Sequence, residues 1–410
     1  MRGGSQCRPV SPGLLCPGRD DPRERNMSDT SHGTGGLAFD KSKRAWPNEV
    51  NIFIALVLIV LIFEALGQLL PYMKGQSMLF DFNSRRDGTI LNMARIKIII
   101  LQVSIIGIIA LGVTQVIITG GIDLSSGSIV GATAMISMSF AQTELVNGNP
   151  NPKAIFGPWA MDLPILVPIA VGLGCGLIAG SINGLLIAYT RIPPFIATLG
   201  MMVSARGVAK WWSRGNPISF PTDEYAAISN GNLVDGLTFG VFSESWIVTQ
   251  VFDGQNPAIY FLLLAVLFHF IMKYTVYGKH TYAIGSNEDA ARMSGINVAW
   301  QKVMVYAIAG MLAGFAAILL TSRNVTAQAG MGFVYELDAI AMAVIGGVSL
   351  AGGRGSIIGT VLGAMIFGVI ISGFTYLKLD AFYQEMVKGG IIVAAVVLDQ
   401  WRQRRAALRS

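Results

Sequence analysis

Long apolar runs separated by short polar stretches dominate the sequence from about residue 50 onward. A helix needs about 20 mostly apolar residues to cross the hydrocarbon core of a bilayer, where the backbone finds no water to bond. The strongest candidate spans are 51–70, 98–119, 124–143, 163–190, 303–321 and 355–377. Shorter or weaker candidates are 195–212, 256–272, 336–350 and 388–399. The sequence therefore predicts an all-α polytopic membrane protein of about ten transmembrane helices.

Composition excludes the other broad classes. Of 410 residues, 52% are hydrophobic and 13% are charged, whereas soluble domains carry about 25% charged residues. The 3 cysteines exclude a disulfide scaffold. The net charge of +6 is spread in short basic clusters between the apolar runs. This distribution is typical of cytoplasmic loops and does not indicate a nucleic-acid partner.

We expect three regions along the chain. Residues 1–45 are polar and lack periodicity, so they are predicted to be disordered. No apolar stretch follows the early arginines, which argues against a signal peptide, and Met27 is a second plausible start. Residues 46–400 form the predicted transmembrane domain, and residues 401–410 form a basic tail.

The distribution of charge predicts the orientation. About ten spans place both termini on one side, and lysines and arginines flank the first and last runs, so both termini are expected in the cytoplasm. The basic segment 273–302 then lies inside, and the acidic segment 213–257 lies outside. Segment 71–97 disagrees, because it is predicted outside yet is basic. Either it contains an interfacial helix or the span count is wrong nearby.

Glycines recur at four-residue spacing within the runs. The sets are Gly127 and Gly131; Gly176, Gly180 and Gly184; Gly310 and Gly314; and Gly355, Gly359 and Gly363. In lipid such spacing lets helix backbones approach closely, so tight packing is the simplest interpretation. Residues 120–131 also resemble residues 346–359, which predicts an internal repeat, although composition alone can produce such a coincidence.

Enzyme signatures are absent from the sequence. It contains no phosphate-binding Gly-x-x-x-x-Gly-Lys-Ser/Thr loop, no His-Glu-x-x-His and no Cys-x-x-Cys. The 3 histidines do not form a metal-binding pattern. We therefore predict no catalytic residues, no metal and no cofactor.

Three carboxylates lie within or beside apolar runs. Asp123 is followed by Ser125 and is costly to bury unless it is solvated, paired or capping. The simplest interpretation is that this aspartate or a serine after it caps a helix over 126–141, and the alternatives are the lining of a solute path or a loop at the membrane surface. Glu336 and Asp338 admit the same alternatives.

The segment 277–296 predicts a short capped helix between glycines. Asn287 can cap a helix from Glu288 to Met293, where acidic residues suit the first turn and Arg292 suits the last. Gly295 is placed to end this helix. The segment is either a well-capped loop helix or a rigid contact for a cytoplasmic partner.

This segment resembles the cytoplasmic coupling motif of ribose/xylose/galactoside-type ABC sugar permeases. Further stretches that resemble the family are 119–125, 192–201, 335–341 and the glycine-rich 346–356. The motifs occur in the family's order, and the resemblance extends over about 95–400. The polar leader, the long 71–95 segment and the polar 144–162 insertion depart from the family pattern.

The resemblance implies a permease subunit in a bacterial inner membrane, without enzymatic activity of its own. Its expected partners are a second permease copy, cytoplasmic ATPase subunits, a periplasmic sugar-binding protein and membrane lipid. The expected ATPase-coupling residues are Gly278, Gly285, Asn287, Glu288, Ala290, Ala291 and Gly295. The expected translocation-pathway residues are Asp123, Ser125, Pro194, Phe195, Thr198, Glu336 and Asp338. The expected solute is a monosaccharide or a related polyol such as inositol.

Two other classes of protein compete with this interpretation. An ion-coupled secondary sugar transporter would use charged residues at mid-membrane, for which Asp123, Glu336 and Asp338 are candidates. It would leave the capped helix at 288–293 unexplained. The other is a membrane-embedded enzyme, which is disfavoured because the sequence contains no nucleophile–base or metal-binding pattern.

Overall fold

The computed structural model describes residues 48–69, 78–80, 92–231 and 255–407. All of them belong to the unit 46–410, and the predicted leader 1–45 lies outside the described residues. The first helices are α1 (Asn48–Leu69), α2 (Met93–Ile118), α3 (Ser126–Ser139), α4 (Leu166–Thr190), α5 (Pro194–Trp212) and α6 (Asp223–Asn230). The others are α8 (Asn256–Tyr274), α9 (Val276–Ser286), α10 (Glu288–Met293), α11 (Val298–Asn324), α12 (Tyr335–Ile345), α13 (Ile357–Tyr376) and α14 (Ala381–Ala407).

The fold is all-α and polytopic, as the apolar runs predict. A helix occupies each of the ten predicted positions, and six of these helices are long and apolar enough to cross a membrane: α1, α2, α4, α8, α11 and α13. Two of the others, α3 and α12, have 14 and 11 residues. Because a span needs about 20 residues, each of these two covers only part of a bilayer.

The two short helices start close together inside the protein. Gly127, in the first turn of α3, lies directly against the side chain and the backbone nitrogen of Glu336, in the first turn of α12. From that meeting point α3 runs toward the first turn of α4, because Ser137 Oγ donates to the carbonyl of Pro168. The end of α12 instead packs against the start of α13, where Gly346 touches Gly359. The two helices therefore diverge from a shared interior region.

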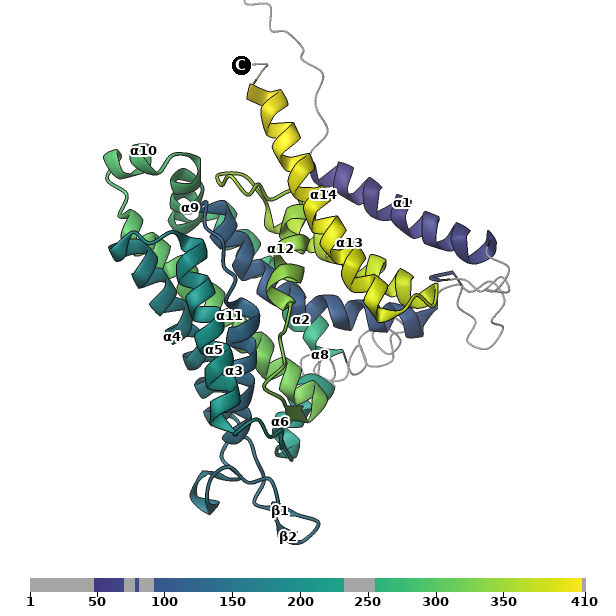
Figure 1. Ribbon diagram of the computed structural model, residues 1–410, viewed down its shortest axis with the longest axis vertical. Coiled ribbons are helices and arrows are strands. Elements are labelled where there is room, and N and C mark those ends of the chain that lie inside the picture. The colour runs from purple at the N-terminus through teal and green to yellow at the C-terminus, as the bar shows by residue number, and fades with distance from the viewer. Residues whose placement is uncertain (1–47, 70–77, 81–91, 232–254, 408–410) are drawn as a thin grey trace, which may run out of the picture. The chain divides into compact units, whose positions relative to one another are not determined.

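Strands are minor in the described part of the chain. β1 (Leu145–Val146) pairs with β2 (Asn149–Pro150) in a hairpin, and β3 (Ile218–Ser219) pairs with β4 (Thr326–Ala327). Figure 1 shows the hairpin at the end of this unit opposite α9 and α10. The 144–162 insertion therefore forms an ordered projection at one end of the helices.

The basic segment 71–97, whose charge disagreed with the predicted orientation, belongs in part to the membrane-spanning helix α2. α2 begins at Met93, so Arg95 and Lys97 lie in its first turns. The Arg95 guanidinium lies over the ring of Tyr376, with its carbon 5.2 Å from the ring centroid. Lys74, Arg85 and Arg86 lie outside the described residues.

Glycine-mediated packing joins α4 to α11. A Cβ at Gly176 would overlap the Gly310 carbonyl oxygen, and one at Gly180 would overlap that of Tyr306. Gly314 approaches Gly172 in the same way. These contacts confirm the tight packing that the glycine spacing predicts, because the two backbones touch along several turns.

Replacing Gly180 with valine should destabilise the protein. The new side chain must push α4 away from α11, and overpacking of this kind costs about 1–3 kcal/mol. Thermal unfolding of the purified protein in detergent measures the effect. The matched control is Gly174→Val on the same helix, where a Cβ meets no atom within 4 Å. Equal melting temperatures for the two variants would contradict the packing interpretation.

Candidate functional site

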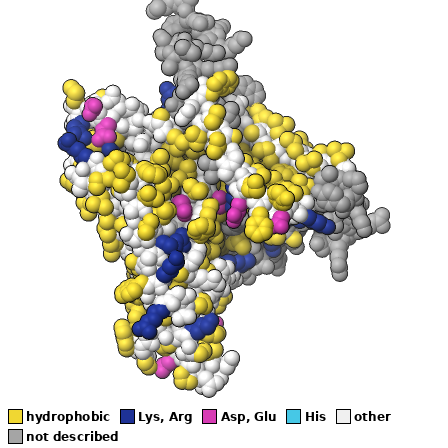
Figure 2. Space-filling model, viewed as in Figure 1, with side chains coloured by type: hydrophobic (Ala, Val, Ile, Leu, Met, Phe, Trp, Pro, Cys, Tyr) yellow, Lys and Arg dark blue, Asp and Glu magenta, His cyan; other side chains and the backbone are white. Residues whose placement is uncertain are grey.

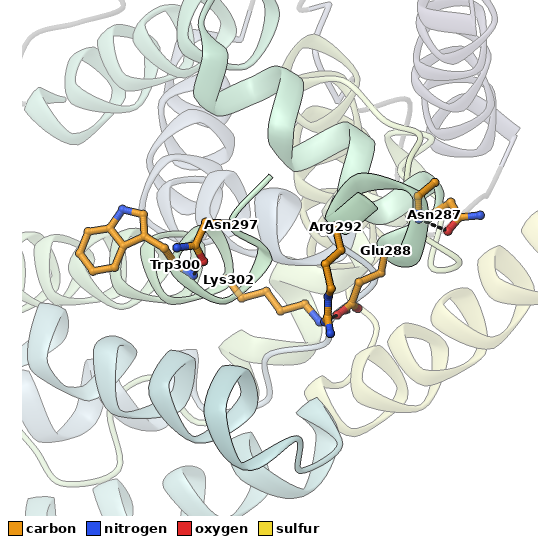
Figure 3. Close-up of polar contacts among 7 residues, drawn as sticks. Asn287, Glu288, Arg292, Asn297, Trp300 and Lys302 are labelled. Atoms are coloured by element: carbon orange, nitrogen blue, oxygen red, sulfur yellow. Dashed lines mark hydrogen bonds and ion pairs between the residues drawn. The ribbon is translucent and has the colours of Figure 1, made fainter. Parts of the chain in front are cut away.

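The segment predicted to contact a partner forms two short helices, α9 and α10. Asn287 caps α10, because its Oδ1 accepts a hydrogen bond from the Ala290 nitrogen at 2.9 Å. Gly295 follows with φ of +84°, a conformation that favours glycine. Asn297 then caps α11 by accepting from the Trp300 nitrogen at 3.0 Å (Figure 3). The capping predicted from the sequence is confirmed.

Glu288 connects α10 to α11. Its two carboxylate oxygens pair with Arg292 at 3.2 Å and with Lys302 at 2.7 Å, and Figure 3 shows the ends of the three side chains converging. The Arg292 pair is exposed and contributes little to stability. The Lys302 side chain is 18% exposed, so its pair is less screened and fixes the position of α10 relative to α11.

Gly285 brings α9 into backbone contact with two distant segments. A Cβ at this position would overlap the carbonyl oxygen of Ile118, at the end of α2, and would lie 2.5 Å from the Gly353 nitrogen. Gly353 itself donates to the Ile118 carbonyl at 2.8 Å. We call this three-way meeting of Gly285, Ile118 and Gly353 the Gly285 contact. It places the glycine-rich stretches around 120 and 352 side by side against α9.

Further hydrogen bonds anchor α9 to the bundle. The Tyr277 hydroxyl donates to Gln115 Oε1 at 2.8 Å, and the Tyr282 hydroxyl donates to the Gly355 carbonyl at 2.9 Å. Burial raises the pKa of both phenols, so they stay protonated and keep donating. Gly278 packs against the Met272 carbonyl with no room for a side chain. α9 is therefore held rigidly against the bundle.

A groove of about 640 Å³ lies beside α10. On one side it is lined by the 187–194 region, where α4 ends and α5 begins, and on the other by α10 and the start of α11. It combines Pro194 with Glu288, Arg292 and Lys302. Nearby, Met293 is 89% exposed. Figure 2 shows basic and acidic side chains gathered at the corner that holds α10. This surface has the shape and mixed charge to receive a protein element.

Asp123 lies in the interior, 1% exposed. Its Oδ1 accepts from the nitrogen and from the hydroxyl of Ser125, at 2.8 and 2.6 Å. Ser125 holds the predicted N-cap position of α3 but makes no side-chain capping bond, and Asp123 is not the cap, because it closes a turn before the helix. The surface-loop alternative is also wrong, because the side chain is buried. Asn183 Nδ2 donates to Ser125 Oγ at 2.8 Å and extends this polar cluster to α4.

Glu336 and Asp338 are buried in the first turn of α12. Glu336 Oε2 has no hydrogen-bond partner in the described part of the chain, and Asp338 Oδ2 pairs with Lys388 at 3.2 Å. Arg206 of α5 donates to the carbonyls of Ala329 and Met331, just before α12, at 3.1 and 2.9 Å. These charges surround the point where α3 and α12 begin.

The remaining predicted pathway residues lie at the start of α5. Thr198 is fully buried, and its hydroxyl donates to the Pro194 carbonyl at 2.9 Å. Phe195 is 51% exposed and points away from the packed core. The structure therefore divides the predicted residues between an end of the bundle, around α9 and α10, and an interior region, around Asp123 and Glu336. Sequence reasoning missed Lys302, Gln115 and Arg206, since each acts through a partner distant in sequence.

Comparison with known proteins identifies the relatives of this chain. The family described as "Branched-chain amino acid transport system / permease component" matches residues 95–396. The galactose/methyl galactoside import permease protein of Haemophilus influenzae is 38% identical over 77% of this chain and 88% of its own length. The ribose import permease protein of Bacillus subtilis is 40% identical over 73% of this chain and 82% of its own length. The ribose import permease protein of Escherichia coli K12 is 36% identical over 74% of this chain and 85% of its own length. No solved structure gives a significant match.

Proposed function

The chain belongs to the permease family of carbohydrate ABC importers, as a membrane subunit without enzymatic activity, and we propose that it carries a monosaccharide or related polyol such as inositol across the bacterial inner membrane. The observation that supports this solute class is the alignment along most of the chain with relatives named for galactose and for ribose import. The specific sugar differs among these relatives, so the proposal covers the class.

We propose that α10 and the groove beside it receive the cytoplasmic ATPase subunit. Three features support this assignment. α10 is capped at Asn287, Glu288 ties it to α11, and α9 is held at Gly278 and Gly285 by backbone contact. A rigid element transmits displacement where a flexible loop would absorb it. Ala290 is exposed on α10, where its small side chain leaves room for a partner, and Ala291 is buried against the rest of the protein.

In this proposal a push on α10 reaches the interior through the Gly285 contact. That contact joins α9 to the residues that lead from α2 into α3 and from α12 into α13. The region where α3 and α12 begin, with Asp123, Ser125 and Glu336, would line the solute path, and Pro194, Phe195, Thr198 and Asp338 would flank it. Sugar hydroxyls can bond to such carboxylate and hydroxyl groups when the helices change their packing.

The orientation follows from the same assignment. Glu49, at the start of α1, bonds Ser356, which follows the Gly355 that Tyr282 of α9 contacts, and the last turns of α14 lie at the same end as α10 (Figure 1). With α10 in the cytoplasm, both termini would therefore be cytoplasmic. The β1–β2 hairpin at the opposite end would face the periplasm, where a sugar-binding protein would deliver solute. A second copy of the permease would complete the pathway.

A panel of labelled solutes tests the proposed substrate class. Vesicles containing the permease, its ATPase and its binding protein should take up one or more of ribose, xylose, galactose and inositol when ATP is supplied. They should not take up leucine, although the family description mentions branched-chain amino acids. ATP-dependent leucine uptake without sugar uptake would contradict the proposal.

Substitutions at α9 and α10 test the coupling assignment. Gly285→Leu forces α9 off Ile118, and Glu288→Lys places three cations together, so each variant should lower sugar uptake about tenfold or more while ATP hydrolysis continues. Uptake and hydrolysis are measured in the same vesicles, and the amount of protein in the membrane is checked for each variant.

The matched control is Gly174→Leu, at an open position on α4. It should transport normally. Normal uptake by Gly285→Leu and Glu288→Lys would remove the coupling assignment while leaving the solute class untouched.

A further inference from the structure

A second cavity lies at the same end of the bundle as α9, away from α10. It has a volume of about 460 Å³ and forms where the last turns of α8, the helix α9 and the start of α13 meet. The lining residues are His269, Met272, Lys273, Lys279, Tyr282, Ser356 and Ile357. This volume is within the range of about 300–1,000 Å³ that small-molecule sites occupy. The proposed transport cycle makes no use of this cavity.

The cavity is cationic on one side. Lys273 and Lys279 line it, and neither forms an ion pair within the described part of the chain. At the opposite margin Ser356 caps α13 by accepting from the Gly359 nitrogen, and its hydroxyl donates to Glu49 of α1 at 3.0 Å. Glu49 places one negative charge at this margin against the two lysines, so the groups around the cavity keep a net positive charge.

An apolar stripe on α8 leads into the cavity. Leu262, Val266, His269 and Lys273 follow one another at spacings of four, three and four residues, so they share one face of the helix. Leu262 is 54% exposed and Val266 is 49% exposed. α8 is one of the six helices able to cross a membrane. The same face is thus apolar along the span and cationic at its end.

We propose that this cavity binds the phosphate headgroup of an anionic phospholipid, with Lys273 and Lys279 on the phosphate and an acyl chain along Leu262 and Val266. Basic pockets between helices at the membrane surface bind such headgroups. A free phosphate shares the headgroup chemistry but leaves the apolar stripe uncovered. The geometry therefore favours the lipid over a soluble anion.

Native mass spectrometry of the purified full chain in detergent tests the site. Added phosphatidylglycerol should be retained more strongly than phosphatidylcholine, and inorganic phosphate should not displace it. Lys273→Gln and Lys279→Gln should each weaken retention about fivefold, and the two together about thirtyfold. Lys273→Arg with Lys279→Arg should retain the lipid, since the charge is kept.

Lys153→Gln is the control, because it removes an exposed lysine at the opposite end of the bundle. Its lipid retention should equal that of the unmodified chain. Undiminished retention in the double glutamine variant, equal retention of the two lipids, or displacement by inorganic phosphate would each overturn the proposal.

Discussion

Close backbone contact at glycine is the constraint on which the rest of this protein depends. Helices in lipid gain little from the hydrophobic effect when they associate, so packing must come from van der Waals contact and interhelical hydrogen bonds. Gly176 and Gly180 meet the backbone of α11, and Gly285 meets the ends of two other segments. The first set holds the helices together, and the second connects the surface helices α9 and α10 to the interior.

This connection gives a physical route from one end of the protein to its centre. The Gly285 contact lies where α2 gives way to the turn containing Asp123 and where α12 gives way to α13. The short helices α3 and α12 begin at one interior point, beside Glu336 and the carbonyls held by Arg206. In the proposed coupling, a displacement that repacks α9 would therefore act on the segments that carry the buried polar groups. Packed elements of this kind switch between discrete arrangements instead of deforming gradually.

Local patterns predicted much of this structure. Run length alone located all ten helical positions, and the residue types at Asn287, Glu288 and Gly295 predicted the capped helix α10. The shortness of α3 was not predicted, because apolar residues continue past Ser139 into a buried turn. The capping role of Asp123 was wrong because its oxygen bonds Ser125 before the helix begins. Arg206 and Lys302 could not be found, since their partners lie in other segments of the chain and leave no local signal.

We propose that this chain is a gate without its own source of energy. The deciding comparison is of sugar accumulation in two kinds of vesicle: one holds the purified chain alone with sodium and proton gradients imposed, and the other also holds the ATPase, the binding protein and ATP. Accumulation against a concentration gradient is expected only in the complete system. Accumulation by the chain alone, driven by either ion gradient, would contradict it.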